Sequence, residues 1–159
     1  MILYHGSKDS DIKEFLLFNK RKNLDFGSGF YLTTQLSQEK KWAGEKGAVY
    51  KFDIDIKSLK VVELYKDDDL NFVFYLCRID LEDIAKDLIE GFKDADIIMG
   101  KMLDGSVIQF EKNAEKTNAG DISYEEFSDK IKLFYDKDQI CFKTQRVMDL
   151  LNKSYIGKI

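Results

Sequence analysis

The chain contains a single histidine, His5, and this restricts the chemistry that it can perform. Zinc sites built on two histidines are impossible, and two cysteines with one histidine supply too few soft ligands for a zinc cluster. A nucleophilic triad would have to use His5, and the Gly-x-Ser-x-Gly turn that carries such a serine is absent from the sequence. We therefore predict no metal site and expect His5 to be either a binding-site imidazole or a hydrogen-bonded structural residue.

Three other short patterns have simpler explanations. Asp25-Phe26-Gly27 matches a protein-kinase triplet, but no kinase catalytic loop accompanies it. Gly27-Ser28-Gly29 completes neither the phosphate-binding loop nor the dinucleotide fingerprint, so it indicates a turn before a strand. The acidic run at 67–69 lacks the spaced ligands of a calcium loop and is typical of a solvated helix start.

The composition is that of a globular protein. The 159 residues are 44% hydrophobic and 34% charged, and we expect one domain spanning 1–159. The net charge of −4 and the lack of a basic stripe give no support to extensive contact with duplex DNA.

Two features of the sequence bear on where the protein works. Cys77 and Cys141 lie far apart in apolar runs, which indicates buried free thiols rather than a disulfide framework. Neither a signal peptide nor an apolar run of the roughly 18 residues that span a membrane is visible. We therefore expect a cytoplasmic protein without a membrane partner.

The elements expected along the chain alternate irregularly between strands and helices. Residues 48–56 alternate apolar and polar side chains, which predicts a half-buried strand. Ser123-x-x-Glu126 predicts a capping box, followed by a helix with Phe127, Ile131 and Phe134 on one face. The other strands are expected at 2–4, 30–33, 61–62, 96–100, 139–144 and 155–156, and the other helices at 35–46, 69–92 and 147–151. This order predicts an α+β fold with a bent or split antiparallel sheet.

Three positions combine with a known motif: His5-Gly6 ends a predicted strand, Tyr31 lies in a second one after a glycine turn, and Gln139 opens a late one. The matching text is Leu3-Tyr4-His5-Gly6-Ser7, Asp25-Phe26-Gly27-x-Gly29-Phe30-Tyr31-Leu32-Thr33-Thr34, Trp42-Ala43, Asp96-Ile97-Ile98-Met99-Gly100 and Gln139-Ile140-x-Phe142-x-Thr144. The chain resembles the His-Tyr-Glu branch of the ADP-ribosyltransferase superfamily and, more narrowly, a bacterial family of unknown function. The resemblance implies an ADP-ribosyltransferase-like fold, a split and bent antiparallel sheet with flanking helices.

The resemblance also implies a role for each matching residue in binding NAD as co-substrate. His5 would hydrogen-bond a hydroxyl of the nicotinamide ribose, and the backbone of Gly6 would hold the nicotinamide amide. Tyr31 would stack on nicotinamide, and Gln139 would stand at the catalytic position. Ser7 and Thr33, in the same segments, are expected to contribute to the NAD site.

The sequence departs from the superfamily pattern at Gln139, where active transferases usually carry glutamate. A glutamine can hydrogen-bond the ribose 2′-hydroxyl, but it supplies no negative charge and accepts no proton. Asp104 is a candidate for the missing charge and equally a turn residue ahead of Gly105. Arg21, Lys22 and Arg78 are candidates for the diphosphate, or else solvated surface charges.

Three functions follow from the resemblance. The first is a mono-ADP-ribosyltransferase that transfers ADP-ribose from NAD to a protein or nucleic acid, as the toxin of a toxin–antitoxin pair with a small antitoxin partner. The second is a non-catalytic nucleotide-binding or interaction module of the same fold, which Gln139 favours. The third is an NAD glycohydrolase with water as acceptor.

Overall fold

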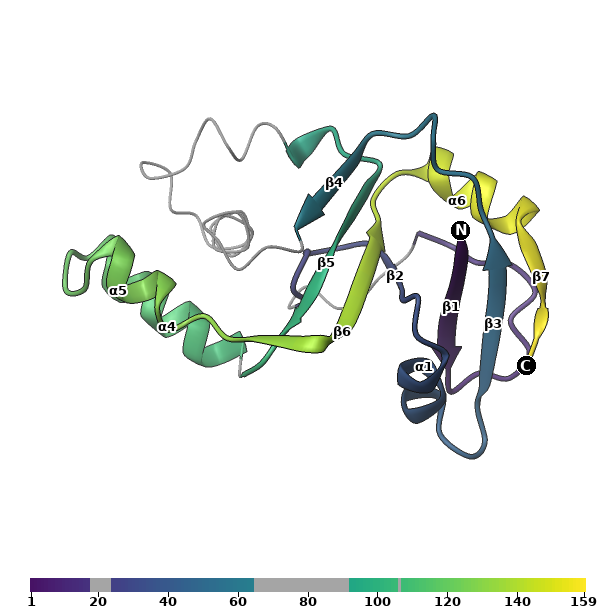
Figure 1. The fold of residues 1–159 in the computed structure, drawn as a ribbon, viewed down its shortest axis with the longest axis horizontal. Helices are drawn as coiled ribbons and strands as arrows, with labels where there is room; N and C mark the ends of the chain where they lie inside the picture. Colours follow the sequence, from purple (N-terminus) through teal and green to yellow (C-terminus); the bar gives the residue numbers. More distant parts are fainter. Residues whose placement is uncertain (18–23, 65–91, 106) are drawn as a thin grey trace.

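The computed structural model describes residues 1–17, 24–64, 92–105 and 107–159, which form a mixed fold of two β-sheets and flanking helices (Figure 1). Its strands are β1 (Ile2–Ser7), β2 (Phe30–Leu32), β3 (Ala48–Asp53), β4 (Val61–Leu64), β5 (Ile97–Leu103), β6 (Leu133–Phe142) and β7 (Tyr155–Lys158). Its helices are α1 (Leu36–Ala43), α4 (Val107–Asn118), α5 (Tyr124–Ser128) and α6 (Gln145–Lys153). The prediction of an α+β fold is confirmed at this level.

The first sheet has the strand order β1-β3-β7, and both pairs are antiparallel. β3 owes its place to the predicted alternation, because Tyr50 and Phe52 are buried while Lys51 is half-buried and Asp53 is exposed. The strand ends at Asp53, three residues earlier than predicted, where the terminal ammonium of Met1 contacts the Asp53 carboxylate at 3.2 Å.

The second sheet has the order β2-β6-β5-β4 and departs from the predicted antiparallel pattern in one pair. β2–β6 and β6–β5 are antiparallel, whereas β4 and β5 are parallel, with Val61 opposite Ile97. A parallel pair needs a crossover of a dozen or more residues, and the chain between Leu64 and Ile97 supplies that length. Sequence alternation alone does not reveal such an arrangement.

Within the described residues, one isolated bridge connects the two sheets, between Tyr4 of β1 and Thr33, which follows β2. The amide of Tyr4 donates to the Thr33 carbonyl at 2.9 Å, and the amide of Thr33 donates back at 3.0 Å. In Figure 1 this connection lies between the β1–β3–β7 sheet and the strands β2, β5 and β6. The β-structure is therefore split into halves of three and four strands.

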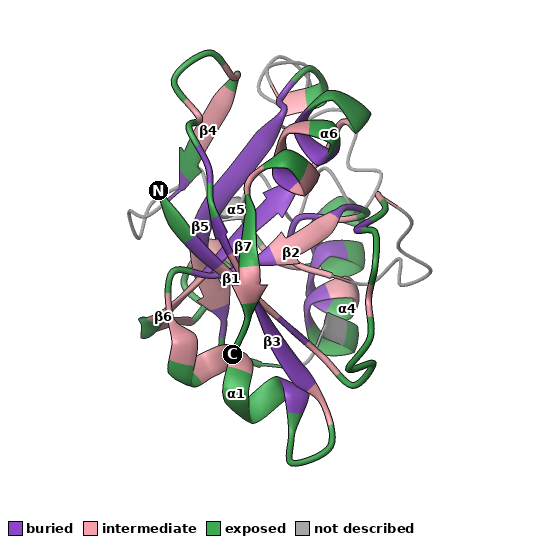
Figure 2. Ribbon diagram, turned by 90° about the vertical axis from the view of Figure 1, so that its right-hand side faces the viewer, coloured by how far each residue is buried: buried purple, intermediate pink, exposed green. Residues whose placement is uncertain are grey.

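The main core lies where these two sheets pack together with α6. Figure 2 shows buried residues along β3, β5 and the inner side of α6. The ring of Phe15 packs edge-on against Tyr50 and Phe52, with ring centroids 5.1 and 4.9 Å apart. Val147, Met148 and Leu151 of α6 are fully buried against the same cluster. The prediction of this helix rested on the i, i+3, i+4 spacing of Val147, Leu150 and Leu151, and Leu150 is partly buried against the same cluster.

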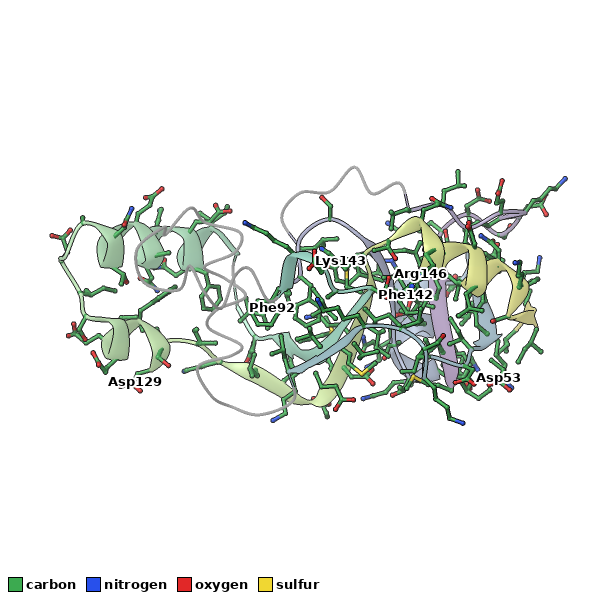
Figure 3. All side chains as sticks on the ribbon, turned by 90° about the horizontal axis from the view of Figure 1, so that it is seen from above. Asp53, Phe92, Asp129, Phe142, Lys143 and Arg146 are labelled. Atoms are coloured by element: carbon green, nitrogen blue, oxygen red, sulfur yellow. The ribbon has the colours of Figure 1, made fainter. Side chains whose placement is uncertain are left out.

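At the far end of the molecule from α6, the helices differ from the sequence prediction (Figures 1 and 3). The capping box forms, because the Glu126 amide donates to Ser123 Oγ at 3.1 Å and the Ser123 amide donates to the Glu126 carboxylate at 2.7 Å. The helix ends at Ser128, however, and Phe134 lies in β6 because pairing with β5 overrides the helical pattern. The prediction of one helix carrying Phe127, Ile131 and Phe134 was therefore wrong.

Several sequence expectations concern segments at the limits of the described structure. α4 was not predicted, although the buried residues Phe110, Ala114 and Thr117 have helical spacing. The helix expected over 69–92 lies, except for its last residue, outside the described residues, as does Cys77. Cys141 is fully buried and carries a free thiol. In the described parts of the chain, every helix is too short or too polar to cross a bilayer.

Candidate functional site

A cleft of about 840 Å³ opens where the end of β1 faces β2, α1 and the middle of β6. This volume lies within the range of small-molecule sites. The walls come from segments far apart in the sequence: His5, Gly6 and Ser7 from β1, Tyr31 from β2, Glu39 from α1 and Gln139 from β6. Leu16 and Trp42 also line it and are 54% and 56% exposed. An apolar, partly aromatic rim of this kind suits a planar organic ligand.

His5 is held in one orientation by its neighbours. Its Nδ1 lies 2.8 Å from the main-chain oxygen of Tyr31, and its ring lies against the Phe30 ring at a centroid distance of 4.3 Å. A carbonyl oxygen only accepts, so Nδ1 carries the hydrogen. Burial lowers the pKa of His5 below its usual value, which favours the neutral imidazole. Nε2 of this tautomer is a bare acceptor, the group that a sugar hydroxyl needs.

Gly6 brings β1 and α1 into direct contact. A Cβ at this position would lie 2.4 Å from the main-chain oxygen of Glu39, so only glycine permits the approach. The amide of Gly6 donates to the Glu39 carboxyl oxygen Oε2 at 2.5 Å. Burial raises the pKa of Glu39 to about 7; the bond from Gly6 opposes the shift and the nearby carboxylate of Asp138 adds to it. The cleft therefore contains a carboxyl group that changes charge near neutral pH.

Tyr31 fixes the turn that precedes β2. Its hydroxyl donates to the Gly27 carbonyl at 2.8 Å and accepts from the Phe26 amide at 3.0 Å. Its ring is stacked on Phe26 with an interplanar angle of 16°. Burial raises the pKa of the phenol well above its usual value, so Tyr31 stays neutral. Tyr31 therefore contributes both an aromatic wall and the anchor of the loop at 24–29.

Gln139 is buried at the back of the cleft and uses its amide nitrogen fully. Nε2 donates to Asp25 Oδ2 at 2.6 Å and to the Lys101 carbonyl at 3.1 Å. Asp25 also accepts from the Leu103 amide at 2.9 Å and lines the cleft. A carboxylate thus lies in hydrogen-bond contact with the Gln139 side chain.

Thr33 is outside the cleft lining and connects the end of β2 to β6 through Asp138. It is fully buried, and its hydroxyl donates to the carboxylate of Asp138, which also accepts from the Thr34 amide at 3.1 Å. Beside it, Gln38 donates to the Asp138 carbonyl at 2.9 Å, while its own Oε1 is buried and finds no hydrogen-bond partner within the described structure. Gln38 lines the cleft, so this wall has an unused acceptor.

The positive charges along the cleft come from lysines. Lys8, Lys41 and Lys137 line it, and the ammonium of Lys137 lies 3.5 Å from the centre of the Phe134 ring. Arg21, Lys22 and Arg78, the residues predicted to hold a diphosphate, lie outside the described residues. Lysine ammonium groups bind phosphate as point charges, so the three lysines are candidates for that role.

Comparison with known proteins gives a family but no activity. The family model described as "Protein of unknown function (DUF3990)" matches residues 1–152. The chain belongs to this DUF3990 family. No curated protein and no solved structure is significantly similar to it. The function of this DUF3990 protein therefore has to be argued from the site itself.

Most of the residues singled out in the sequence come together in the DUF3990 structure. His5, Gly6, Ser7, Tyr31 and Gln139 line one cleft, whereas Thr33 is packed behind its wall. Asp104 is exposed, outside the cleft lining, and its amide donates to the Lys132 carbonyl at 2.8 Å.

Sequence reasoning missed the three acidic residues among those that line the DUF3990 cleft, Asp25, Glu39 and Asp136. Asp25 stands in the Asp25-Phe26-Gly27 segment, which was interpreted as a chance match to a kinase triplet, so no role was assigned to its carboxylate. Glu39 lies in the predicted helix at 35–46 with no local signal. Its contact with Gly6, 33 residues away, is visible only in the fold.

Proposed function

We propose that the protein is a mono-ADP-ribosyltransferase that uses NAD as co-substrate and modifies a macromolecular acceptor. The observation that carries the proposal is the convergence of His5 from β1, Tyr31 from β2 and Gln139 from β6 on one cleft. These three residues are the ones that the sequence resemblance assigns to NAD. The split into a three-stranded and a four-stranded sheet supports an ADP-ribosyltransferase-like fold.

The proposed reaction exchanges one bond at the ribose. The bond between C1′ and the nicotinamide nitrogen breaks, and its electron pair leaves with nicotinamide, which becomes neutral. A nucleophilic oxygen or nitrogen of the acceptor bonds to C1′, and its proton passes to solvent. Because positive charge develops on the ribose during this exchange, nearby negative charge and hydrogen-bond acceptors favour it.

The donor and acceptor groups of the cleft fit a dinucleotide in three respects. Nε2 of His5 is a bare acceptor for a ribose hydroxyl, and the Tyr31 ring is an aromatic wall. Lys8, Lys41 and Lys137 supply positive charge for a diphosphate. In a fourth respect the cleft has to adjust, because Glu39 holds the Gly6 amide that would bind the nicotinamide carboxamide. Binding there requires Glu39 to release that hydrogen bond.

Incubation with NAD and a bacterial lysate tests this function. We expect release of nicotinamide and a macromolecular product heavier by one ADP-ribosyl group, both measured by mass spectrometry. Glu45→Gln is a suitable control, since Glu45 is exposed in the turn between α1 and β3 and is outside the cleft lining. Absence of both nicotinamide and adduct would overturn the proposal. Free ADP-ribose without an adduct would indicate a glycohydrolase instead.

A non-catalytic nucleotide-binding module is the second candidate. The absence of a carboxylate at position 139 and the engagement of the Gly6 amide by Glu39 favour it. Gln139→Glu separates the two functions. A gain in NAD turnover would indicate a decayed enzyme, whereas a loss would indicate that glutamine is the working residue. Given the 2.6 Å contact with Asp25, the transferase proposal predicts a loss.

A further inference from the structure

The environment of Gln139 determines which of its atoms faces a ligand. Both donors of its amide group are engaged, one by Asp25 Oδ2 at 2.6 Å and the other by the Lys101 carbonyl at 3.1 Å. No described residue donates a hydrogen bond to Gln139 Oε1. This oxygen is also not fully buried. Gln139 thus turns its NH₂ group to the protein and keeps its carbonyl oxygen as the acceptor for the cleft.

We infer that Asp25 supplies, through Gln139, the negative charge that a glutamate at position 139 would otherwise supply. This inference rests on the proposed transferase function. A carboxylate that accepts from an amide NH₂ polarises the amide and increases the negative charge on its oxygen. Asp25 also contributes its own charge, because it lines the same cleft. It is a positioning residue that acts through Gln139.

Asp25 is held rigidly enough for this role. Its Oδ2 accepts from the Leu103 amide of β5 at 2.9 Å as well as from Gln139. The next two residues of the turn are tied to the Tyr31 hydroxyl, through the Phe26 amide and the Gly27 carbonyl. The carboxylate is therefore held by β5, and the main chain that follows it is held by Tyr31. Electrostatic stabilisation depends on such preorganisation.

The same geometry accounts for glutamine, rather than glutamate, at position 139. Two carboxylates at 2.6 Å cannot both be ionised without a large cost. A pair of one glutamine and one aspartate has a single negative charge, and the glutamine NH₂ group donates to the aspartate oxygen. The pair has the same total charge as a single glutamate but distributes it over two residues from different elements.

Asp25→Asn tests the inference, because asparagine keeps the size and an accepting oxygen but removes the charge. We expect kcat for nicotinamide release to fall by about 100-fold. KM for NAD should change less than threefold and the melting temperature should be close to that of the wild type. Asp121→Asn is the matched control, with the same change of charge at an exposed residue outside the cleft lining. Unchanged kcat in Asp25→Asn, with an active wild type, would overturn the inference and leave the transferase proposal standing.

A charge exchange supplies a second test with a readout that needs no NAD. In Gln139→Glu two carboxylates meet, so its melting temperature should fall more steeply than that of the wild type between pH 5 and pH 8. Asp25→Asn/Gln139→Glu restores one charge and one amide, and should recover both the stability and at least a tenth of the wild-type kcat. A double variant no more stable or active than Gln139→Glu would count against the pair. If the wild type itself releases no nicotinamide, the transferase proposal fails, and this inference fails with it.

Discussion

The imidazole of His5 donates from Nδ1 to the main-chain oxygen of Tyr31 across 2.8 Å, and so links two of the residues predicted to form the NAD site. The bond crosses from one sheet to the other, since His5 is in β1 and Tyr31 in β2. It fixes the ring and leaves Nε2 as an acceptor that a ligand can use. The first prediction separates these two roles.

His5→Asn should keep the hydrogen bond to the Tyr31 carbonyl, because the asparagine NH₂ group lies near the place of Nδ1. It should lose the acceptor that Nε2 offers to a ribose hydroxyl. We expect its melting temperature to exceed that of His5→Ala, while NAD affinity falls about tenfold in both, the cost of one hydrogen bond. Thermal unfolding and calorimetric titration with NAD measure the two effects. Wild-type affinity in His5→Asn would show that Nε2 does not contact the ligand.

Tyr31→Phe removes one hydroxyl that forms two hydrogen bonds with the turn containing Asp25. The Phe26 amide and the Gly27 carbonyl lose a partner, so the free energy of unfolding should drop by roughly 1–3 kcal/mol. Denaturant titration measures this loss. Because the ring is retained, NAD binding through stacking should persist while kcat falls. A variant with normal kcat would show that the turn needs no anchor.

Glu39 gives the stability of the protein a pH dependence near neutrality. Its pKa in the folded protein, about 7, is above its ordinary value of 4.5. The stabilisation that the protonated carboxyl provides is therefore fully present below pH 4.5 and is lost as the pH rises through 7. Glu39→Gln keeps the acceptor for Gly6 without the charge. At pH 8 it should be more stable than the wild type by roughly 1 kcal/mol, as measured by urea unfolding. No difference between pH 5 and pH 8 would contradict this assignment.

Asp96 gives the stability of the protein a pH dependence of the opposite sign, at acid pH. Burial alone would raise its pKa, but hydrogen bonds from the Lys60 amide, Arg146 and Thr144 lower it below the ordinary value of 3.8. The stabilisation is thus present above pH 3.8 and is lost as the pH falls through the folded-state pKa. Figure 3 labels Arg146 close to Phe142, at the junction of β6 and α6.

Asp96→Asn should lower the free energy of unfolding by roughly 2–3 kcal/mol at pH 7, because an NH₂ group would face the donors that the carboxylate accepts. Urea unfolding at pH 7 and pH 4 measures the loss and its pH dependence. Asp94→Asn is the control: Asp94 contacts the Lys60 ammonium at 3.5 Å but its side chain is 79% exposed, and such pairs contribute about 1 kcal/mol or less. Equal effects of the two substitutions would rule out a special role for Asp96.

Local patterns predicted the elements whose burial is periodic. The alternation at Tyr50 and Phe52 predicted β3, and the apolar spacing at Val147 and Leu151 predicted α6. Helical spacing gave a wrong prediction for Phe134, which lies in β6 because pairing with β5 decides its conformation. The parallel pairing of β4 with β5 was also beyond reach, because it depends on a crossover rather than on any local signal.

The residues of the candidate site also fall into those that local sequence patterns could indicate and those that they could not. His5, Tyr31 and Gln139 could be selected because each stands in or beside a predicted strand, within a segment that resembles a superfamily motif. Asp25 and Glu39 could not, since their importance comes from contacts 114 and 33 residues away in the sequence. A carboxylate that reaches a site from another element leaves no spacing pattern to detect.

The bridge between Tyr4 and Thr33 connects the two sheets that carry the residues of the cleft. His5 belongs to one sheet and Gln139 to the other, so the bridge and the His5–Tyr31 bond help to set how these two cleft residues lie relative to each other. Tyr4 and Thr33 both lie outside the cleft lining. Substitutions of Tyr4 or Thr33 are therefore expected to change the spacing between His5 and Gln139 while every residue that lines the cleft is kept.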